Sequence, residues 1–164
     1  MLFRSARFLI AVEDRRGPVV RITGDCPLID PALVDATIER FSSAPGCAYA
    51  TNIDPRRFPD GLDVEVIDAA VLRAVATEEL SPEEREHVTL AIRTQPERFP
   101  ASALIGSEDL GELRWTVDEA GDLEFVRAVV ERLGERRYEA GMKEILDAVR
   151  APPSLAGLGG HVRG

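Results

Sequence analysis

The chain has 164 residues, and 20 basic against 29 acidic side chains give it a formal net charge of −9 at pH 7. This length fits one domain, and the composition, 45% hydrophobic and 30% charged, is that of a folded globular chain. The acidic balance argues against nucleic-acid binding, and no apolar run is long enough for a membrane span. Because Cys26 and Cys47 cannot form a disulfide framework, we expect a cytoplasmic setting.

The apolar pattern switches repeatedly between the strand period and the helix period, which predicts an α/β fold with a mostly parallel or mixed sheet flanked by helices. We expect strands at 19–22, 47–53, 62–67, 101–105 and 113–117. Helices are expected at 5–14, after Asp30, at 69–77, after Ser81 and at 142–149. A further helix is expected where Leu123, Val126, Val130 and Leu133 form an apolar stripe. Residues 1–150 are predicted to form one domain, followed by a flexible Pro/Gly-rich tail at 151–164.

Two helix starts carry recognisable caps. Asp30 precedes Pro31, which is the pattern of an N-cap followed by proline at the first helical position. Ser81 and Glu84 have the spacing of a capping box.

Two acidic residues follow expected strands. Asp25 comes after the strand at 19–22, and Asp118 comes after the strand at 113–117, with no cation expected beside either one. If both strands are parallel, the two carboxylates emerge at one edge of the sheet and repel each other unless a cation lies between them. Mg²⁺ suits such a site, because one or two carboxylates and substrate phosphates commonly hold it. The alternative is that both residues only cap turns and helices.

Four segments, in this order, carry a resemblance to a known family. They are RITGDCPLIDP at 21–31, FPDGLDVEV at 58–66, EREHVT at 84–89 and LRWTVD at 113–118. Together they resemble the cytidylyltransferases that activate acidic sugars, and within that family the SpsF-like branch named for spore-coat polysaccharide biosynthesis.

The resemblance implies a GT-A-like nucleotidyltransferase fold that uses CTP and Mg²⁺, with Asp25 and Asp118 as the metal-site aspartates. A sugar hydroxyl would attack the α-phosphorus of CTP, and pyrophosphate would leave. A GT-A glycosyltransferase is an alternative that fits less well, because Pro27 stands where an Asp-x-Asp pair would need its second aspartate.

No catalytic residue is assigned, but six residues are candidates for substrate binding: Arg21, Asp60, Asp63, Glu65, Arg85 and His87. Asp63 and Glu65 share one face of the expected strand, and the alternative for them is a solvated strand face. The neighbouring pair Arg56 and Arg57 suits a substrate anion or a plain surface position.

The family's Gly/Arg/Lys-rich phosphate loop has no counterpart before Val19, since 1–16 contains no glycine and Lys143 is the only lysine. We therefore expect a truncated form with little or no transferase activity alone. An exposed sheet edge then favours a homo-oligomer. A non-catalytic remnant or partner module is the alternative from a different functional class.

Overall fold

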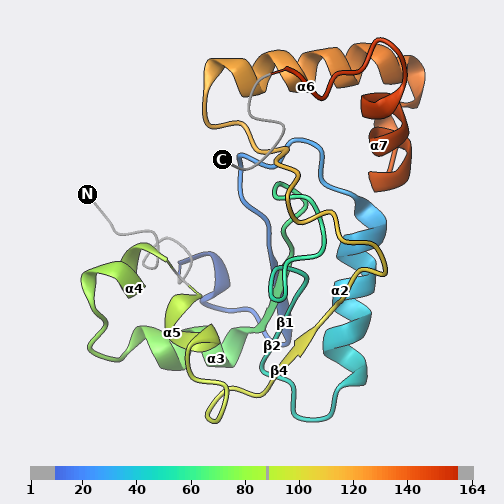
Figure 1. Cartoon of the computed structure of the whole chain (residues 1–164). Helices are drawn as coiled ribbons and strands as arrows, with labels where there is room; N and C mark the ends of the chain where they lie inside the picture. Colours follow the sequence, from blue (N-terminus) through green and yellow to red (C-terminus); the bar gives the residue numbers. More distant parts are fainter. Residues whose placement is uncertain (1–9, 88, 159–164) are drawn as a thin grey trace. The chain divides into compact units, whose positions relative to one another are not determined.

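The computed structural model describes residues 10–87 and 89–158, which divide into two compact units (Figure 1). The sheet unit comprises the described residues of 10–21, 37–51 and 65–104, and the helical unit comprises 22–36, 52–64 and 105–158. The expectation of one domain over 1–150 stays a prediction. No helix within the described ranges is long and apolar enough to cross a bilayer.

The sheet unit contains one four-stranded mixed sheet. Its strands are β1 (Pro18–Arg21), β2 (Tyr49–Thr51), β3 (Glu65–Asp68) and β4 (Ala101–Ala103), in the spatial order β1-β3-β2-β4. β3 is antiparallel to both β1 and β2, and β2 is parallel to β4. This confirms the mixed form of the predicted sheet. Four of the five expected strands are present, with shifted or shortened bounds.

Three short helices follow β3 in the sheet unit: α3 (Ala69–Ala76), α4 (Pro82–Glu86) and α5 (Leu90–Arg93). Helices α3 and α5 pack on the sheet through a buried apolar cluster that includes Tyr49, Ile67 and Ile92, whereas α4 has no buried residue. Figure 1 shows them on one side of the strands, while the part of α2 (Pro31–Ser43) that belongs to the sheet unit lies on the other. The capping box at Ser81 is confirmed, but the single helix expected behind it is split, because α4 ends at Glu86 and α5 begins at Leu90.

Strand β1 is an edge strand whose backbone groups alternate in direction. The amide of Ala69 donates to the carbonyl of Gly17, and Val19 pairs with Ile67, so the backbone groups of Gly17 and Val19 face β3. The backbone groups of Val20 therefore face away from β3, where no other described strand pairs with β1. Within the described residues the sheet therefore has an open edge at β1, and β4 is the edge strand on the other side.

The helical unit is built around α6 (Ala120–Leu133), the 3-10 turn η1 (Gly134–Tyr138) and α7 (Met142–Arg150), together with the start of α2 (Pro31–Ser43). Helices α6 and α7 share a buried cluster with loop residues, whose members include Leu28, Leu62, Trp115, Phe125, Val129, Ile145 and Val149. The expected apolar stripe on α6 is partly wrong. Leu123 is exposed and Val130 is only partly buried, whereas Phe125 and Val129, which the stripe did not include, are buried.

One buried carboxylate joins the starts of two helices in this unit. Asp30 Oδ1 accepts from the amide of Ala32 at 2.8 Å, which confirms the predicted cap of α2. Its Oδ2 accepts from the amide of Met142, the first residue of α7, at 2.7 Å. Gly141 is needed beside it, because a Cβ there would come within 2.9 Å of Asp30 Oδ2.

Three other expectations meet different outcomes. The strand expected at 113–117 is wrong, since this segment forms only an isolated bridge between Asp60 and Arg114. Of the helix expected at 5–14, residues 10–12 are helical and 5–9 lie outside the described residues. The first part of the expected tail is packed: Leu155 is buried in the cluster of the helical unit.

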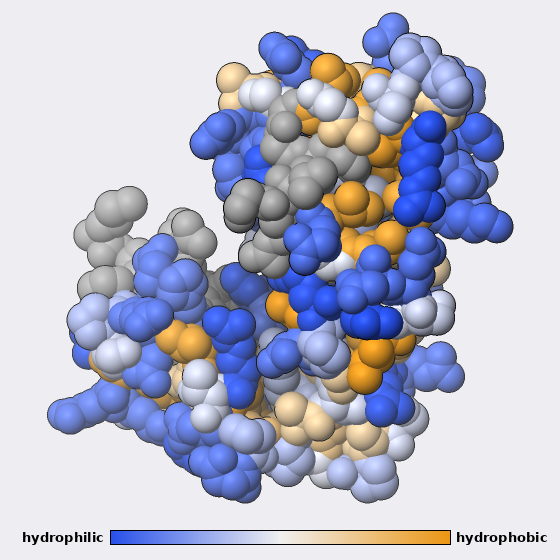
Figure 2. Space-filling view, in the orientation of Figure 1, coloured by the Kyte–Doolittle hydropathy of each residue, from blue (hydrophilic) through white to orange (hydrophobic). Residues whose placement is uncertain are grey.

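The surface seen in Figure 2 is mostly polar, with small separate apolar patches, as the acidic composition leads one to expect.

Candidate functional site

Three chain segments of the helical unit, 22–26, 56–63 and 113–122, are joined by backbone hydrogen bonds; we call them the three-segment site. The amide of Val117 donates to the carbonyl of Asp25 at 2.9 Å. Asp60 donates through its amide to Leu113 at 2.9 Å and accepts through its carbonyl from Trp115 at 2.6 Å. Backbone hydrogen bonds thus connect the third segment, which contains Asp118, to Asp25 on one side and to Asp60 on the other.

The middle segment approaches the third one unusually closely. Gly61 has φ +106°, and a Cβ there would lie 2.7 Å from the carbonyl carbon of Trp115, so no larger residue fits without a shift of the backbone. The buried Asn52 fixes the end of the same segment, because its side chain donates to Leu62 O at 2.7 Å and accepts from the amide of Val64 at 2.8 Å. The site is therefore held by backbone contacts that do not require a regular strand.

Asp118 is held by a polar cluster at the start of α6. Its Oδ2 accepts from Arg114 Nη1 at 3.3 Å and from the Thr116 hydroxyl at 3.1 Å. Arg114 is itself bound by both oxygens of Asp122, at 3.0 and 2.5 Å, and these hydrogen bonds raise the pKa of its guanidinium. The expectation that no nearby cation faces Asp118 is wrong, because Arg114 lies four residues before it.

Asp60 and Asp63 lie beside Arg56 in the middle segment. Arg56 binds Asp63 through two parallel hydrogen bonds of 2.9 Å and lies 3.4 Å from Asp60. Burial lowers the pKa of Arg56, but the hydrogen bonds and charge of Asp63 outweigh it and raise the pKa overall. Arg57 pairs with Asp109 at 3.1 Å, so both arginines already bind carboxylates of the chain.

Cys26 sits next to Asp25 as a buried thiol. Burial raises its pKa from 9.0 to about 11, and the nearby charges of Asp25 and Asp63 add to this, against a hydrogen bond with Thr23 that lowers it. The thiol is therefore protonated at neutral pH, which fits a packing role for Cys26 rather than that of a nucleophile.

Arg21 and Glu65 belong to the sheet unit and pair with each other across β1 and β3. Glu65 is 2% exposed and also accepts from the Tyr49 hydroxyl at 2.7 Å. Burial and the charge of Glu65 raise the pKa of Tyr49 far above its usual value. The alternative of a solvated strand face is thus wrong for Glu65, which is a buried member of an internal ion pair.

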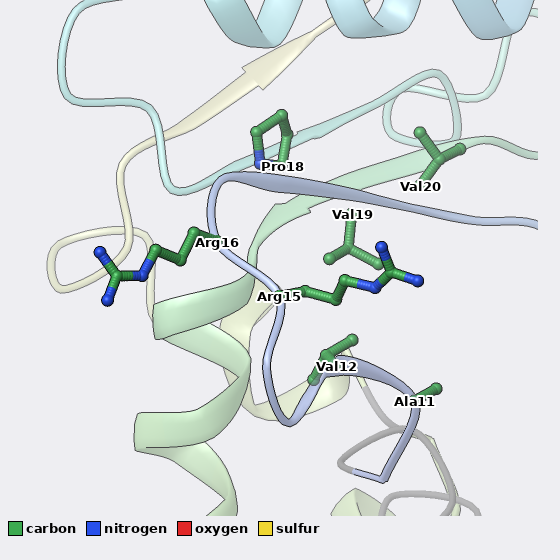
Figure 3. A pocket seen from close by; sticks show the side chains of 7 residues that line it. All are labelled: Ala11, Val12, Arg15, Arg16, Pro18, Val19 and Val20. Atoms are coloured by element: carbon green, nitrogen blue, oxygen red, sulfur yellow. The ribbon is translucent and has the colours of Figure 1, made fainter.

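Arg85 and His87 lie in the sheet unit as well, at the end of α4, and both are exposed. The first turn of α4 is already capped, since Glu84 accepts from the amide of Ser81 at 2.8 Å. A separate pocket of about 430 Å³ in the same unit lies along β1 (Figure 3). It is lined by residues of 11–20 and includes no predicted site residue.

The donor set of the three-segment site suits a hard cation that substrate oxygens complete. Within the part of the chain that the structure describes, no three His, Cys, Asp or Glu side chains gather as a metal cage. One carboxylate from each of two bonded segments, Asp25 and Asp118, is nevertheless what Mg²⁺ commonly takes from a protein when phosphate oxygens and water supply the remainder. Their roles as ligands stay a prediction.

Sequence reasoning missed Arg114, Thr116, Asp122 and Asn52. The spacing of four between Arg114 and Asp118 was visible, but it has meaning as a pair mainly on a helix, and a strand was expected there. Asn52 gave no signal, because its partners Leu62 and Val64 are brought to it only by the fold.

Two known proteins resemble this chain. In sequence it is 29% identical to the spore coat polysaccharide biosynthesis protein SpsF of Bacillus subtilis, over 92% of this chain and 62% of SpsF. In structure it matches a cytidylyltransferase from Leptospira borgpetersenii, with a TM-score of 0.84 and 25% identity over 92% of this chain and 63% of that one. No family model matches the sequence.

These comparisons confirm the resemblance inferred from the four segments and the fold class. The chain is homologous to SpsF and has the fold of the matching part of a cytidylyltransferase. It spans less than two thirds of the length of either protein.

Proposed function

We propose that this chain, a homologue of SpsF with the fold of a cytidylyltransferase, acts in the transfer of a cytidylyl group from CTP to an acidic or modified sugar for surface polysaccharide or glycan biosynthesis. The observation that carries the proposal is the hydrogen bond between Val117 and Asp25, which brings two segments of the family motif into one site. Both cysteines are free, which supports a reducing cytoplasm as the compartment.

In the proposed reaction a bond forms between the sugar oxygen and the α-phosphorus, and the bond from that phosphorus to pyrophosphate breaks. Asp25 and Asp118 would hold Mg²⁺, which when bound offsets the negative charge that develops on the phosphate oxygens. The chain has a net charge of −9 and would have to bind the polyanion CTP, so a cation between them would offset their mutual repulsion.

The other candidates take secondary positions in this proposal. Asp60 and Asp63 lie in the three-segment site, and we assign them to sugar hydroxyls, with Arg56 keeping their charges balanced. Arg21 and Glu65 would act by fixing β1 against β3, since they pair with each other. For Arg85 and His87 only the motif and their exposure support a substrate contact.

Formation of a CMP-sugar, followed by mass spectrometry and by pyrophosphate release, tests the proposal. We expect a weak signal from the 164-residue chain, since it spans 62% of SpsF. Asp25→Asn and Asp118→Asn should each reduce the rate by roughly 100-fold or more, because each removes charge stabilisation of the transition state. Asp109→Asn, an exposed acid in the same unit, is the matched control.

Two results would count against this assignment. Unchanged turnover in Asp25→Asn would remove Asp25 from the metal site. If no CMP-sugar forms and CTP does not bind in the presence of Mg²⁺, the transferase assignment fails for this chain, which favours the alternative of a non-catalytic partner module.

The open edge of β1 favours that second function, in which the chain associates with another copy of itself. The outward N–H and C=O of Val20 can pair antiparallel with the same groups of a second β1, which is a self-complementary arrangement. Val20→Pro removes the outward donor and leaves the groups of Val19 that face β3, whereas Val20→Ala keeps the donor.

Light scattering after size exclusion should give a dimer mass for the wild type and Val20→Ala, and a monomer mass for Val20→Pro with an unchanged circular dichroism spectrum. A monomeric wild type, or a dimeric Val20→Pro, excludes this edge as the interface.

A further inference from the structure

The Asp118 carboxylate is anchored on one side only. Both of its hydrogen bonds, from Arg114 at 3.3 Å and from Thr116 at 3.1 Å, end on Oδ2. Among the described residues, no hydrogen bond reaches Oδ1, and the side chain is 59% exposed. The carboxylate thus has one oxygen, Oδ2, that is held by two donors, and one, Oδ1, with no hydrogen bond among the described residues, on a largely exposed side chain.

The anchor is a buried acid. Asp122 is 2% exposed, and its carboxylate binds the Arg114 guanidinium through two nitrogens. Its Oδ2 also accepts from the amides of Asp118 and Glu119, both at 3.0 Å. One buried group therefore fixes the backbone of Asp118 and, through Arg114, its side chain.

We propose that Arg114 and Asp122 are positioning residues that orient Asp118 as a ligand through one oxygen, Oδ1, with Oδ2 retained by Arg114. This inference rests on the proposed function, because it takes Asp118 as a ligand of the divalent cation. It adds how the chain itself sets the geometry of that ligand.

Two physical reasons support this role over that of an ordinary surface ion pair. An exposed ion pair orders two side chains and contributes little stability in return. Arg114 is already held by the buried Asp122, so its contact with Asp118 orders only one further, short side chain. Partners that orient a metal ligand in this way commonly change metal affinity by 10- to 100-fold. The guanidinium on Oδ2 also leaves Oδ1 as the oxygen that would bind the ion.

Mn²⁺ binding to the full chain in the presence of CTP, measured by electron paramagnetic resonance, tests the proposal. Arg114→Gln should weaken Mn²⁺ binding by about 10-fold at an unchanged fold, and Asp122→Asn should weaken it at least as much. Arg98→Gln, which breaks the exposed pair with Glu78 in the sheet unit, is the matched control and should bind Mn²⁺ as the wild type does.

Hydrogen exchange gives a second measurement that does not depend on the metal. Asp122→Asn should reduce the protection of the Asp118 and Glu119 amides, while Arg114→Gln should leave those amides protected. A purely structural role would change the exchange of both variants without changing Mn²⁺ affinity.

The outcomes separate the two proposals. If the wild type binds Mn²⁺ and Arg114→Gln binds it equally or more tightly, Arg114 does not orient Asp118, and the inference fails while the metal site stands. If the wild type and all variants fail to bind Mn²⁺ with CTP, the proposed metal site itself is wrong, and the inference is excluded with it.

Discussion

Single buried carboxylates join separate segments of this chain. Asp122 fixes the start of α6 to Arg114, Asp30 joins the first turn of α2 to that of α7, and Glu65 joins β3 to Arg21 and Tyr49. Each of these acids has its hydrogen-bond partners inside its own unit, so burial does not leave its charge unsatisfied. In an acidic protein, these inward acids have a structural role that the many exposed ones do not share.

Asp30 provides a direct test of such a residue. Asp30→Ala removes two helix caps together and should lower the free energy of unfolding by about 2 kcal/mol, since one cap contributes about 1 kcal/mol. Asp30→Asn retains one acceptor and should lose about half as much. The midpoint of urea unfolding measures both effects.

Asp35→Ala, at an exposed position on the same helix, is the control and should leave the midpoint near that of the wild type. An Asp30→Ala variant as stable as this control would show that the contact with Met142 contributes nothing.

At the scale of elements, the signals that lie within a few residues of each other were sufficient for prediction. The caps at Asp30 and Ser81 and the helices α3 and α7 occur where their local patterns place them. These features depend on hydrogen bonds between near neighbours in the chain, which composition and spacing reveal.

Elements that depend on distant partners were predicted less well. The segment 113–117 has the apolar alternation of a strand, but it bonds to Asp25 and Asp60 in loops and so never joins the sheet. Glu65 alternates with apolar residues as a solvated strand residue does, yet Tyr49 and Arg21 bury it. In both cases the deciding partner comes from another part of the chain.

The candidate site shows the same division. Its acids could be proposed from their positions after expected strands and from the family motif, whereas Arg114, Asp122 and Asn52 could not, because their contacts exist only after folding. The two parallel strands expected to bring Asp25 and Asp118 together were wrong, because 113–117 forms no strand. A hydrogen bond from Val117 to Asp25 joins the two backbones instead, and a shared cation site stays a prediction.

At the scale of the whole molecule, the two units alternate along the sequence. The sheet unit takes residues from three separate stretches, and so does the helical unit. Each hydrophobic cluster stays within its own unit, so every cluster depends on residues that are distant in sequence.

This arrangement predicts how fragments behave. The fragment 105–164 retains α6 and α7 but lacks Leu28, Leu62 and the Asp30 cap. We expect it to be largely unfolded alone, with poorly dispersed amide signals in a proton–nitrogen correlation spectrum and less helix than it has in the full chain. Well-dispersed signals from this fragment would show that α6 and α7 need no other segment for their core.

The same alternation limits how such a protein changes by recombination. A crossover at most positions between 22 and 104 separates at least one unit from part of its own interior. Neither unit can therefore be exchanged between genes as one uninterrupted stretch of sequence.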